Sequence, residues 1–74
     1  MKMIQIQSSN IESVGYDPET KILEITFNNK SIYQYNEVPK SIYDSLMKTN
    51  KEGGSVGRYF LANVKGVYEF SRIA

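Results

Sequence analysis

The sequence predicts an α+β fold in which two short helices pack on one face of a small antiparallel β-sheet. Two observations support this prediction. Through the first half of the chain, apolar residues recur at every second position, as they do in half-buried strands. In the second half they recur three and four residues apart, which is the spacing of one helix face. We therefore expect a strand-rich first half and a helix-rich second half.

Four segments of the first half have a strand pattern. In chain order they are residues 4–7, 11–16, 21–27 and 32–36. The third segment is the clearest, because Leu23, Ile25 and Phe27 fall on one face of an extended chain. This face is the one that we expect the helices to cover.

Two turns connect the later strands. Pro18 presets φ, and Asp17 can accept a hydrogen bond from the backbone just ahead of it, so both residues indicate a turn rather than a site. Residues 28–31 form a tight hairpin loop, because asparagine tolerates left-handed conformations. The loop length decides the face of Tyr33 and Tyr35. A loop of two or four residues places them opposite the apolar face, and a loop of three places them on it. Both alternatives stay open.

The second half contains two helices and a closing strand. Residues 39–49 form the first helix, with Pro39 at the first helical position. Ser55 caps the second helix, which Gly66 stops. The largely apolar face of this second helix consists of Val56, Tyr59, Phe60, Asn63 and Val64. Residues 67–73 form the last strand, which we expect to pair with an earlier strand because an unpaired terminal strand invites aggregation.

Length and composition exclude several classes of function. The 74 residues weigh 8.5 kDa and form one domain, residues 1–74. Cysteine and histidine are absent, which excludes disulfides, thiolate metal sites, cysteine nucleophiles and Ser-His triads. The carboxylates are scattered through the elements, and no serine has an activating base nearby. We therefore expect no enzymatic activity, no cofactor and no metal.

Charge and size bear on compartment and partners. No signal-peptide pattern or membrane-span pattern is present, so we expect a cytoplasmic protein without a membrane partner. Nine basic and eight acidic residues give a net charge of +1, which provides no strong overall field for long nucleic acids. A domain this small is marginally stable alone, so we also expect a homo-oligomer.

Two groups of residues are candidates for binding a phosphate-bearing ligand. Tyr33 and Tyr35 would stack on bases if their face is open, and are core residues if it is covered. The glycine-rich segment before and within the second helix offers backbone N–H groups to a phosphate; its alternative reading is a capped helix with Gly57 packed tightly against a neighbour. The candidate ligand-binding residues are Tyr33, Tyr35, Ser55, Gly57, Arg58, Tyr59 and Lys65. Arg72 is a further cation that folding could bring near Lys65.

Several short motifs occur in a fixed order along the chain. They are Val14-Gly15-Tyr16-Asp17, the strand Leu23 to Phe27, Tyr33-Gln34-Tyr35, Val38-Pro39, Ser55-Val56-Gly57-Arg58-Tyr59-Phe60, and Val64-Lys65 with Tyr68. In this order and spacing they resemble the KTSC domain, a family named for its occurrence at the C-terminus of some lysyl-tRNA synthetases. The resemblance covers about residues 8–70, and it implies a single small domain and a role in RNA binding. The stretch 51–54 departs from the family pattern by lengthening the loop between the helices.

These observations favour a small non-enzymatic domain that binds a nucleic acid or a nucleotide. Tyr33 and Tyr35 would stack on bases, while Arg58, Lys65 and the N–H groups near Ser55 would hold phosphates. The near-zero net charge favours a compact ligand, either a nucleotide or a short RNA end, and the domain could act by sequestering it. The alternative is a protein-interaction or homo-oligomeric assembly domain whose partner is a host protein or a second copy.

Overall fold

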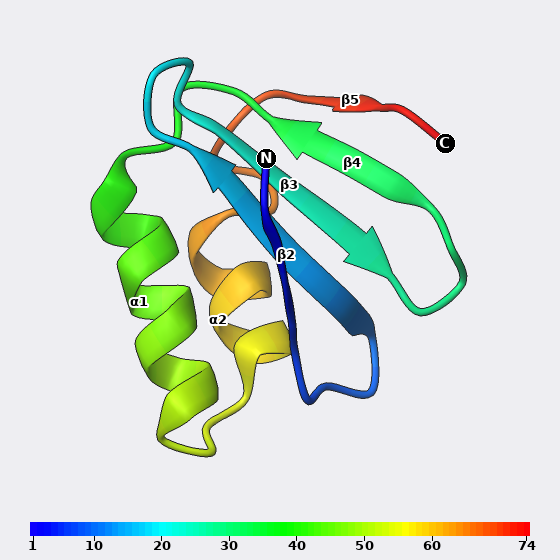
Figure 1. The fold of residues 1–74 in the computed structure, drawn as a ribbon, viewed down its shortest axis with the longest axis vertical. Coiled ribbons are helices and arrows are strands. Elements are labelled where there is room, and N and C mark those ends of the chain that lie inside the picture. The colour runs from blue at the N-terminus through cyan, green and yellow to red at the C-terminus, as the bar shows by residue number, and fades with distance from the viewer.

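The computed structural model describes residues 1–74 and contains a five-stranded antiparallel sheet with two helices (Figure 1). The elements are β1 (Met3–Gln5), β2 (Ile11–Asp17), β3 (Ile22–Phe27), β4 (Ile32–Tyr35), α1 (Lys40–Lys51), α2 (Val56–Asn63) and β5 (Phe70–Arg72). The strands lie in the sheet in chain order, although both helices come between β4 and β5. This architecture confirms the predicted α+β class.

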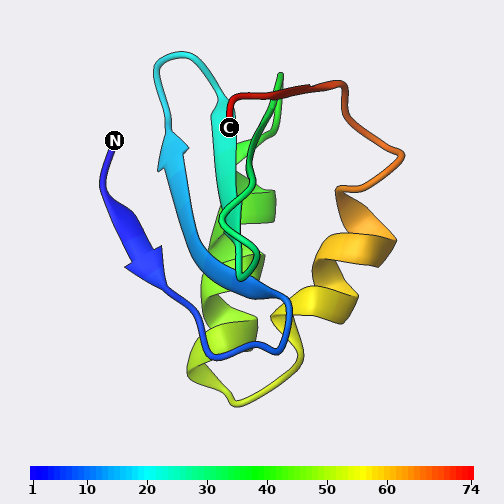
Figure 2. The ribbon, with the colours of Figure 1, turned by 90° about the vertical axis from the view of Figure 1, so that its right-hand side faces the viewer.

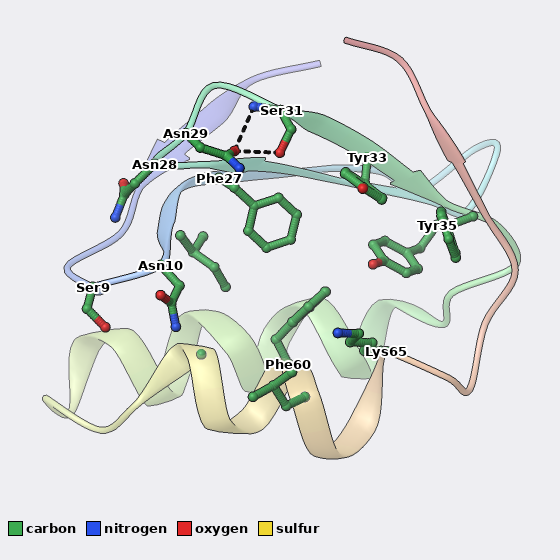
Figure 3. Close-up of a pocket in the computed structure, with 14 residues that line it drawn as sticks. Ser9, Asn10, Phe27, Asn28, Asn29, Ser31, Tyr33, Tyr35, Phe60 and Lys65 are labelled. Carbon is green, nitrogen blue, oxygen red and sulfur yellow. Dashed lines mark hydrogen bonds between the residues drawn. The ribbon is translucent and has the colours of Figure 1, made fainter.

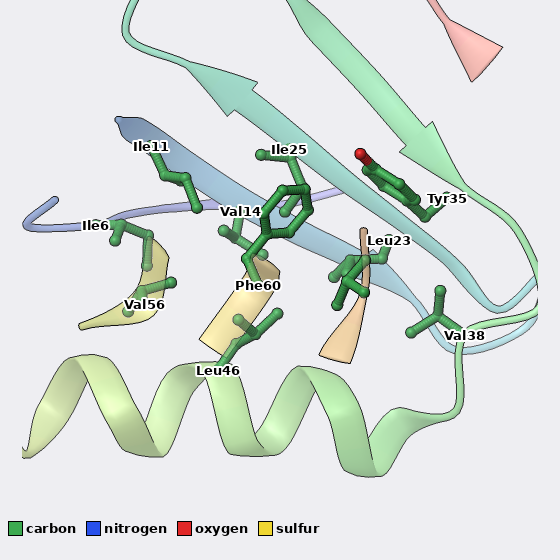
Figure 4. Close-up of a cluster of buried hydrophobic side chains, with 11 residues drawn as sticks. Ile6, Ile11, Val14, Leu23, Ile25, Tyr35, Val38, Leu46, Val56 and Phe60 are labelled. Atoms are coloured by element: carbon green, nitrogen blue, oxygen red, sulfur yellow. The ribbon is translucent and has the colours of Figure 1, made fainter. Parts of the chain in front are cut away.

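Both helices lie on the same face of the sheet, as Figures 1 and 2 show together. The apolar residues of the central strands point toward them, and Figure 4 shows Leu46 of α1 and Phe60 of α2 facing Ile25 and Leu23 of β3. The core consists of Ile6, Ile11, Val14, Leu23, Ile25, Tyr35, Val38, Leu46, Val56, Phe60 and Val64. One layer of helices on one layer of sheet is thus joined by one hydrophobic core.

The hairpin between β3 and β4 has a three-residue loop. The Phe27 amide donates to the Ser31 carbonyl at 2.9 Å, and Lys30 takes a left-handed conformation with φ of 74°. The register that follows pairs Ile25 with Tyr33 and, two pairs further, Leu23 with Tyr35. Both tyrosines therefore lie on the helix-covered face. Of the two alternatives left open by the sequence, the three-residue loop is the correct one.

The first helix differs from the prediction at both ends. Pro39 has an extended conformation, with ψ of 149°, and is the residue that precedes α1 rather than its first helical residue. The helix then continues to Lys51, beyond the predicted end at Thr49, and the chain turns at Gly53 with φ of 76°. The loop between the helices is therefore shorter than the sequence suggested, because α1 includes two residues that were expected to lie beyond its end.

The last strand is shorter than predicted but pairs as expected. Val67 and Tyr68 both donate their amides to the Val64 carbonyl, at 3.1 and 3.2 Å, so they still belong to the turns that end α2. Gly66 has φ of 80° and fits its predicted role as the helix stop. The strand begins only at Phe70, and it pairs antiparallel with β4.

Two smaller predictions about local structure can be compared directly. Asp17 is a turn residue: its Oδ1 accepts the Glu19 amide at 3.0 Å, as the sequence indicated. The N-terminal strand is Met3–Gln5, which begins one residue earlier and ends two residues earlier than predicted, and Ile6 follows it as a core residue. In addition, neither helix has the length and apolar character needed to cross a membrane.

Candidate functional site

A pocket of about 620 Å³ opens between α2 and the half of the sheet formed by β3, β4 and β5 (Figure 3). Side chains from the sheet face side chains from α2 across it. Fourteen residues line the pocket, and most of them belong to an aromatic group or to a group of asparagines and serines, with Lys65 as the single cation. A volume of this size lies within the range of ordinary small-molecule sites.

Five aromatic side chains form a closed ring of contacts at the pocket. The ring centroids are 5.5 Å apart for Phe27 and Tyr33, 5.3 Å for Tyr33 and Phe70, and 5.6 Å for Phe70 and Tyr35. Phe60 closes the ring, at 5.4 Å from Tyr35 and 5.7 Å from Phe27. Most of these pairs have the edge-on or tilted geometry that aromatic pairs favour. The pocket therefore has a continuous aromatic wall.

The fold explains how this ring forms from distant parts of the chain. Tyr33 and Tyr35 are two residues apart on β4 and so share a face. Register places Phe70 of β5 opposite Tyr35, on that same face. Phe27 comes from the end of β3 and Phe60 from α2. Tyr35 is buried, with 3% of its surface exposed, whereas Phe70 is 55% exposed, so the wall runs from the core out to solvent.

Asparagine and serine side chains line the end of the pocket at the β3–β4 loop and the segment before β2. The backbone N–H of Asn28 donates to the backbone carbonyl of Asn10 at 2.9 Å, which holds these two segments together. The side-chain Nδ2 of Asn28 donates to the Ser8 carbonyl, and Oδ1 of Asn29 accepts from the amide and the hydroxyl of Ser31. This end of the pocket is polar and carries no charge.

Lys65 is the one charged residue among the 14 that line the pocket, and none of them is acidic. Its backbone amide donates to the Phe60 carbonyl at 3.0 Å, which anchors the lysine just beyond the last turn of α2. A second cation lies beside the aromatic wall, because the guanidinium carbon of Arg72 is 5.9 Å from the centroid of the Tyr33 ring. The pocket is therefore suited to an anionic or neutral ligand.

Burial raises the pKa of Tyr35 above its ordinary value, and the neighbouring Tyr33 adds to the shift. The Tyr35 phenol is therefore neutral under ordinary conditions and offers an O–H group rather than negative charge to the pocket. No group of three or more His, Cys, Asp or Glu side chains lies together in the structure as a metal site would need.

The structure brings together four of the seven candidate residues: Tyr33, Tyr35, Gly57 and Lys65 line the pocket. Ser55, Arg58 and Tyr59 are not among the lining residues. Ser55 caps α2, because its Oγ accepts the backbone amide of Arg58 at 3.2 Å. That amide, expected to be available to a phosphate, is thus already used by the cap.

Gly57 is buried and lies at the pocket, but it is not tightly packed. A Cβ placed on it would have its nearest neighbour, Ser8 Oγ, at 3.5 Å, which is ordinary van der Waals contact. The sequence-based reading of Gly57 as a close-packing glycine is therefore wrong. Arg58 is exposed and its side chain forms no ion pair, and Tyr59 packs against the core.

Sequence reasoning missed most of the aromatic wall and all of the asparagines. Phe27 and Phe60 were assigned only to apolar faces, and Phe70 was assigned only to the last strand. A partial signal exists in the Asn28-Asn29 pair, which marks both the loop and the polar end of the pocket. No local pattern reveals Phe70, because only its pairing with β4 brings it to Tyr35.

Comparison with known proteins identifies close relatives of this fold. The KTSC domain matches residues 7–68 of the chain. The crystal structure of a KTSC domain protein from Yersinia pestis superposes with a TM-score of 0.89 at 34% identity, over 99% of this chain and 97% of the other.

Two further relatives show where similar chains occur. An uncharacterized protein of Stutzerimonas stutzeri is 42% identical over 60 residues, which are 81% of this chain and 79% of that protein. A lysine–tRNA ligase of Nostoc sp. is 28% identical over 72 residues, which are 97% of this chain but only 12% of the ligase. The match over most of the chain, together with the shared fold, shows that this protein belongs to the KTSC domain family.

Proposed function

We propose that this protein binds a nucleotide in the pocket between α2 and the sheet, without catalysing a reaction. The observation that carries the proposal is the composition of the lining, in which a closed wall of five aromatic rings stands beside one lysine and no carboxylate. A nucleotide joins a flat aromatic base to an anionic group, and it complements both features. A tight binder of this kind would act in the cytoplasm by sequestering its ligand.

The aromatic wall supports base stacking. Phe70 is 55% exposed and Tyr33 is half-buried, so both rings keep area free for a ligand. The buried Tyr35 packs against Phe70 from the core side. Stacking of one base on an aromatic side chain is worth about 1–3 kcal/mol. This term alone makes the wall the main source of affinity for a small planar ligand.

The local charge supports an anionic group on the same ligand. The protein as a whole has a net charge of only +1, so attraction at long range is weak. Lys65 at the pocket and Arg72 over Tyr33 are nevertheless not opposed by any carboxylate in the lining. A short ligand with one or a few phosphates fits this pattern better than a long RNA, which needs a track of cations.

The proposal can be tested by calorimetric titration with 5′-AMP at low ionic strength. Lys65→Ala and Phe70→Ala change exposed side chains at the pocket, so both variants should fold, and each should lose about tenfold or more in affinity. Arg58→Ala is the matched control, because Arg58 is an exposed cation of α2 that does not line the pocket, and it should bind like the wild type. Absence of mononucleotide binding by the wild type, or equal affinity in all three variants, would contradict the proposal.

A second candidate function is assembly with another protein or with a second copy. Leu61, Val67 and Phe70 are each at least 55% exposed, and Leu61 and Phe70 share the pocket lining. Exposed apolar side chains of this size are typical of interfaces. A native mass spectrum distinguishes the two functions: an oligomer without retained nucleotide that Leu61→Ser reduces to monomers favours assembly, and a monomer that takes up AMP favours nucleotide binding.

A further inference from the structure

We infer that the pocket prefers an adenine nucleotide and holds it in one direction, with the adenine edge at the asparagines and the phosphate at Lys65. This inference rests on the proposed nucleotide binding and goes beyond it, because it names the base and the orientation. It comes from the difference between the two ends of the pocket.

The two ends of the pocket lie at opposite ends of α2. Asn10 is beside the first turn, since its Nδ2 is 4.0 Å from the position that a Cβ on Gly57 would take. Lys65 lies beyond the last turn, and the six residue steps from Gly57 to Asn63 alone correspond to about 9 Å along the helix axis. Figure 3 shows Phe27 and Phe60 facing each other between Asn10 and Lys65. A ligand in the pocket thus has one neutral amide end and one cationic end beside it.

The amide end has free hydrogen-bonding atoms of both kinds. Asn28 uses its Nδ2 on the Ser8 carbonyl, which leaves its Oδ1 as an acceptor. Asn29 uses its Oδ1 on Ser31, which leaves its Nδ2 as a donor. The side chain of Asn10 makes no hydrogen bond within the protein, so a donor and an acceptor are free on the same amide. An adjacent donor–acceptor pair is what a base edge requires.

The residue types at this end favour adenine over the other bases. Asparagine pairs through two hydrogen bonds with the donor and acceptor of an adenine edge, whereas guanine is usually read by Arg or Lys, and the cytosine amino group by Asp or Glu. Neither a carboxylate nor an arginine lines the pocket, and its one lysine is at the far end. Lys30 of the adjacent hairpin does not line the pocket and is paired with Glu12 at 2.6 Å. Of these characteristic partners, only that of adenine is present at the amide end.

The orientation follows from the same arrangement. The amide end has no cation for a phosphate, while the aromatic wall separates it from Lys65. A phosphate is therefore best placed at Lys65, the one cation that lines the pocket. A base that stacks on the aromatic wall cannot also be stacked within a duplex, so the site takes a free nucleotide or a single-stranded end.

The test is a pair of double-mutant cycles in which chemical groups of the ligand serve as the second mutation. Three probes are titrated by calorimetry: 5′-AMP, purine riboside 5′-monophosphate, which lacks the 6-amino group, and adenosine, which lacks the phosphate. The proteins are the wild type, Asn10→Ala, Lys65→Ala and the control Arg58→Ala. Asn10 is exposed and its side chain has no internal partner, so Asn10→Ala should retain its thermal midpoint.

The expected pattern assigns one ligand group to each residue. Removing the 6-amino group should cost the wild type and Lys65→Ala about tenfold in affinity, and should cost Asn10→Ala almost nothing. Removing the phosphate should cost the wild type and Asn10→Ala several-fold, and should cost Lys65→Ala almost nothing. The control should behave like the wild type with all three probes.

The outcomes separate this inference from the proposed function. If 5′-AMP binds but the 6-amino group matters equally in Asn10→Ala and the wild type, the adenine preference is wrong while nucleotide binding stands. If Asn10 instead couples to the phosphate, the orientation is reversed and the inference is wrong. If the wild type binds none of the nucleotides, both the inference and the proposed function are wrong.

Discussion

Tyr35 illustrates how one residue serves both the core and the pocket. It is 3% exposed, belongs to the hydrophobic core, and contacts Phe60 and Phe70 through its ring. Of the two readings that the sequence left open for this tyrosine, the core residue is therefore the correct one, and Tyr35 supports the exposed ring of Phe70 rather than offering a stacking surface of its own. Its burial also gives a measurable consequence, because burial raises the pKa of the Tyr35 phenol.

We predict that Tyr35→Phe makes the protein more resistant to alkali. A group whose pKa is raised on folding stabilises the folded state below its unfolded pKa, here the ordinary value of 10.0, and this contribution is lost as the pH rises through the folded pKa. The wild type should lose stability above pH 10.0, and Tyr35→Phe should lose less. Urea unfolding of both proteins at neutral pH and at several pH values above 10.0 measures the difference.

Tyr16 also contributes to the alkaline sensitivity of both proteins. Its pKa is also raised, mainly by burial, and its hydroxyl donates to the Val38 carbonyl, so both proteins retain some alkaline sensitivity. The same pH dependence in wild type and Tyr35→Phe would mean that the Tyr35 phenol is not desolvated as the structure indicates.

The face of Tyr33 and Tyr35 could not be predicted from residue types. The Asn28-Asn29 pair suggested that an asparagine takes the left-handed position of the hairpin, but Lys30 takes it, with φ of 74°. The loop length depends on which residue adopts that conformation. The loop length in turn decides on which face of the sheet Tyr33 and Tyr35 lie. The choice is made by burial of the tyrosines against the helices, which is a tertiary effect.

At the scale of elements, α2 carries both a local stability signal and part of the pocket. Its cap was predictable, because Ser55 directly precedes an amphipathic stretch, and the cap bond to the Arg58 amide is present. Its contribution to the pocket was not predictable, since no pattern in the sequence separates Gly57 and Lys65 from Arg58 and Tyr59. Only the packing of α2 on the sheet decides which of its residues face the pocket.

We predict that Ser55→Ala lowers the free energy of unfolding by about 1 kcal/mol, as is typical for loss of a helix cap. Affinity for 5′-AMP should not change, because Ser55 does not line the pocket. Chemical denaturation and calorimetric titration of the same preparation measure both quantities. A large loss of affinity for 5′-AMP with an unchanged free energy of unfolding would show that Ser55 belongs to the binding site, and would contradict a purely structural role.

The ends of elements were less predictable than their existence. The patterns correctly indicated five strands and two helices, but β5 begins three residues later than predicted, at Phe70. The turns that follow α2 occupy Val67 and Tyr68, since both amides bond to the Val64 carbonyl. An alternating apolar pattern continues through these turns and does not distinguish them from a strand.

At the scale of the whole molecule, the site depends on the return of the chain to the sheet. The two helices separate β4 from β5, yet β5 pairs with β4 and brings Phe70 to Tyr35 and Arg72 to Tyr33. The fold class was predictable because strand and helix periods differ clearly in the two halves. The aromatic wall was not, because it joins residues whose proximity arises only from that long-range pairing.

The central claim is that the pocket between α2 and the sheet binds a nucleotide, and backbone amide NMR tests it most directly. Titration of the ¹⁵N-labelled protein with 5′-AMP should shift the amides of Asn10, Gly57, Lys65 and Phe70, which line the pocket, and should leave the exposed Lys48 of α1 unchanged. Saturable shifts confined to the pocket are the result that this account predicts. Unchanged spectra at millimolar 5′-AMP, or shifts located on another face of the protein, would contradict it.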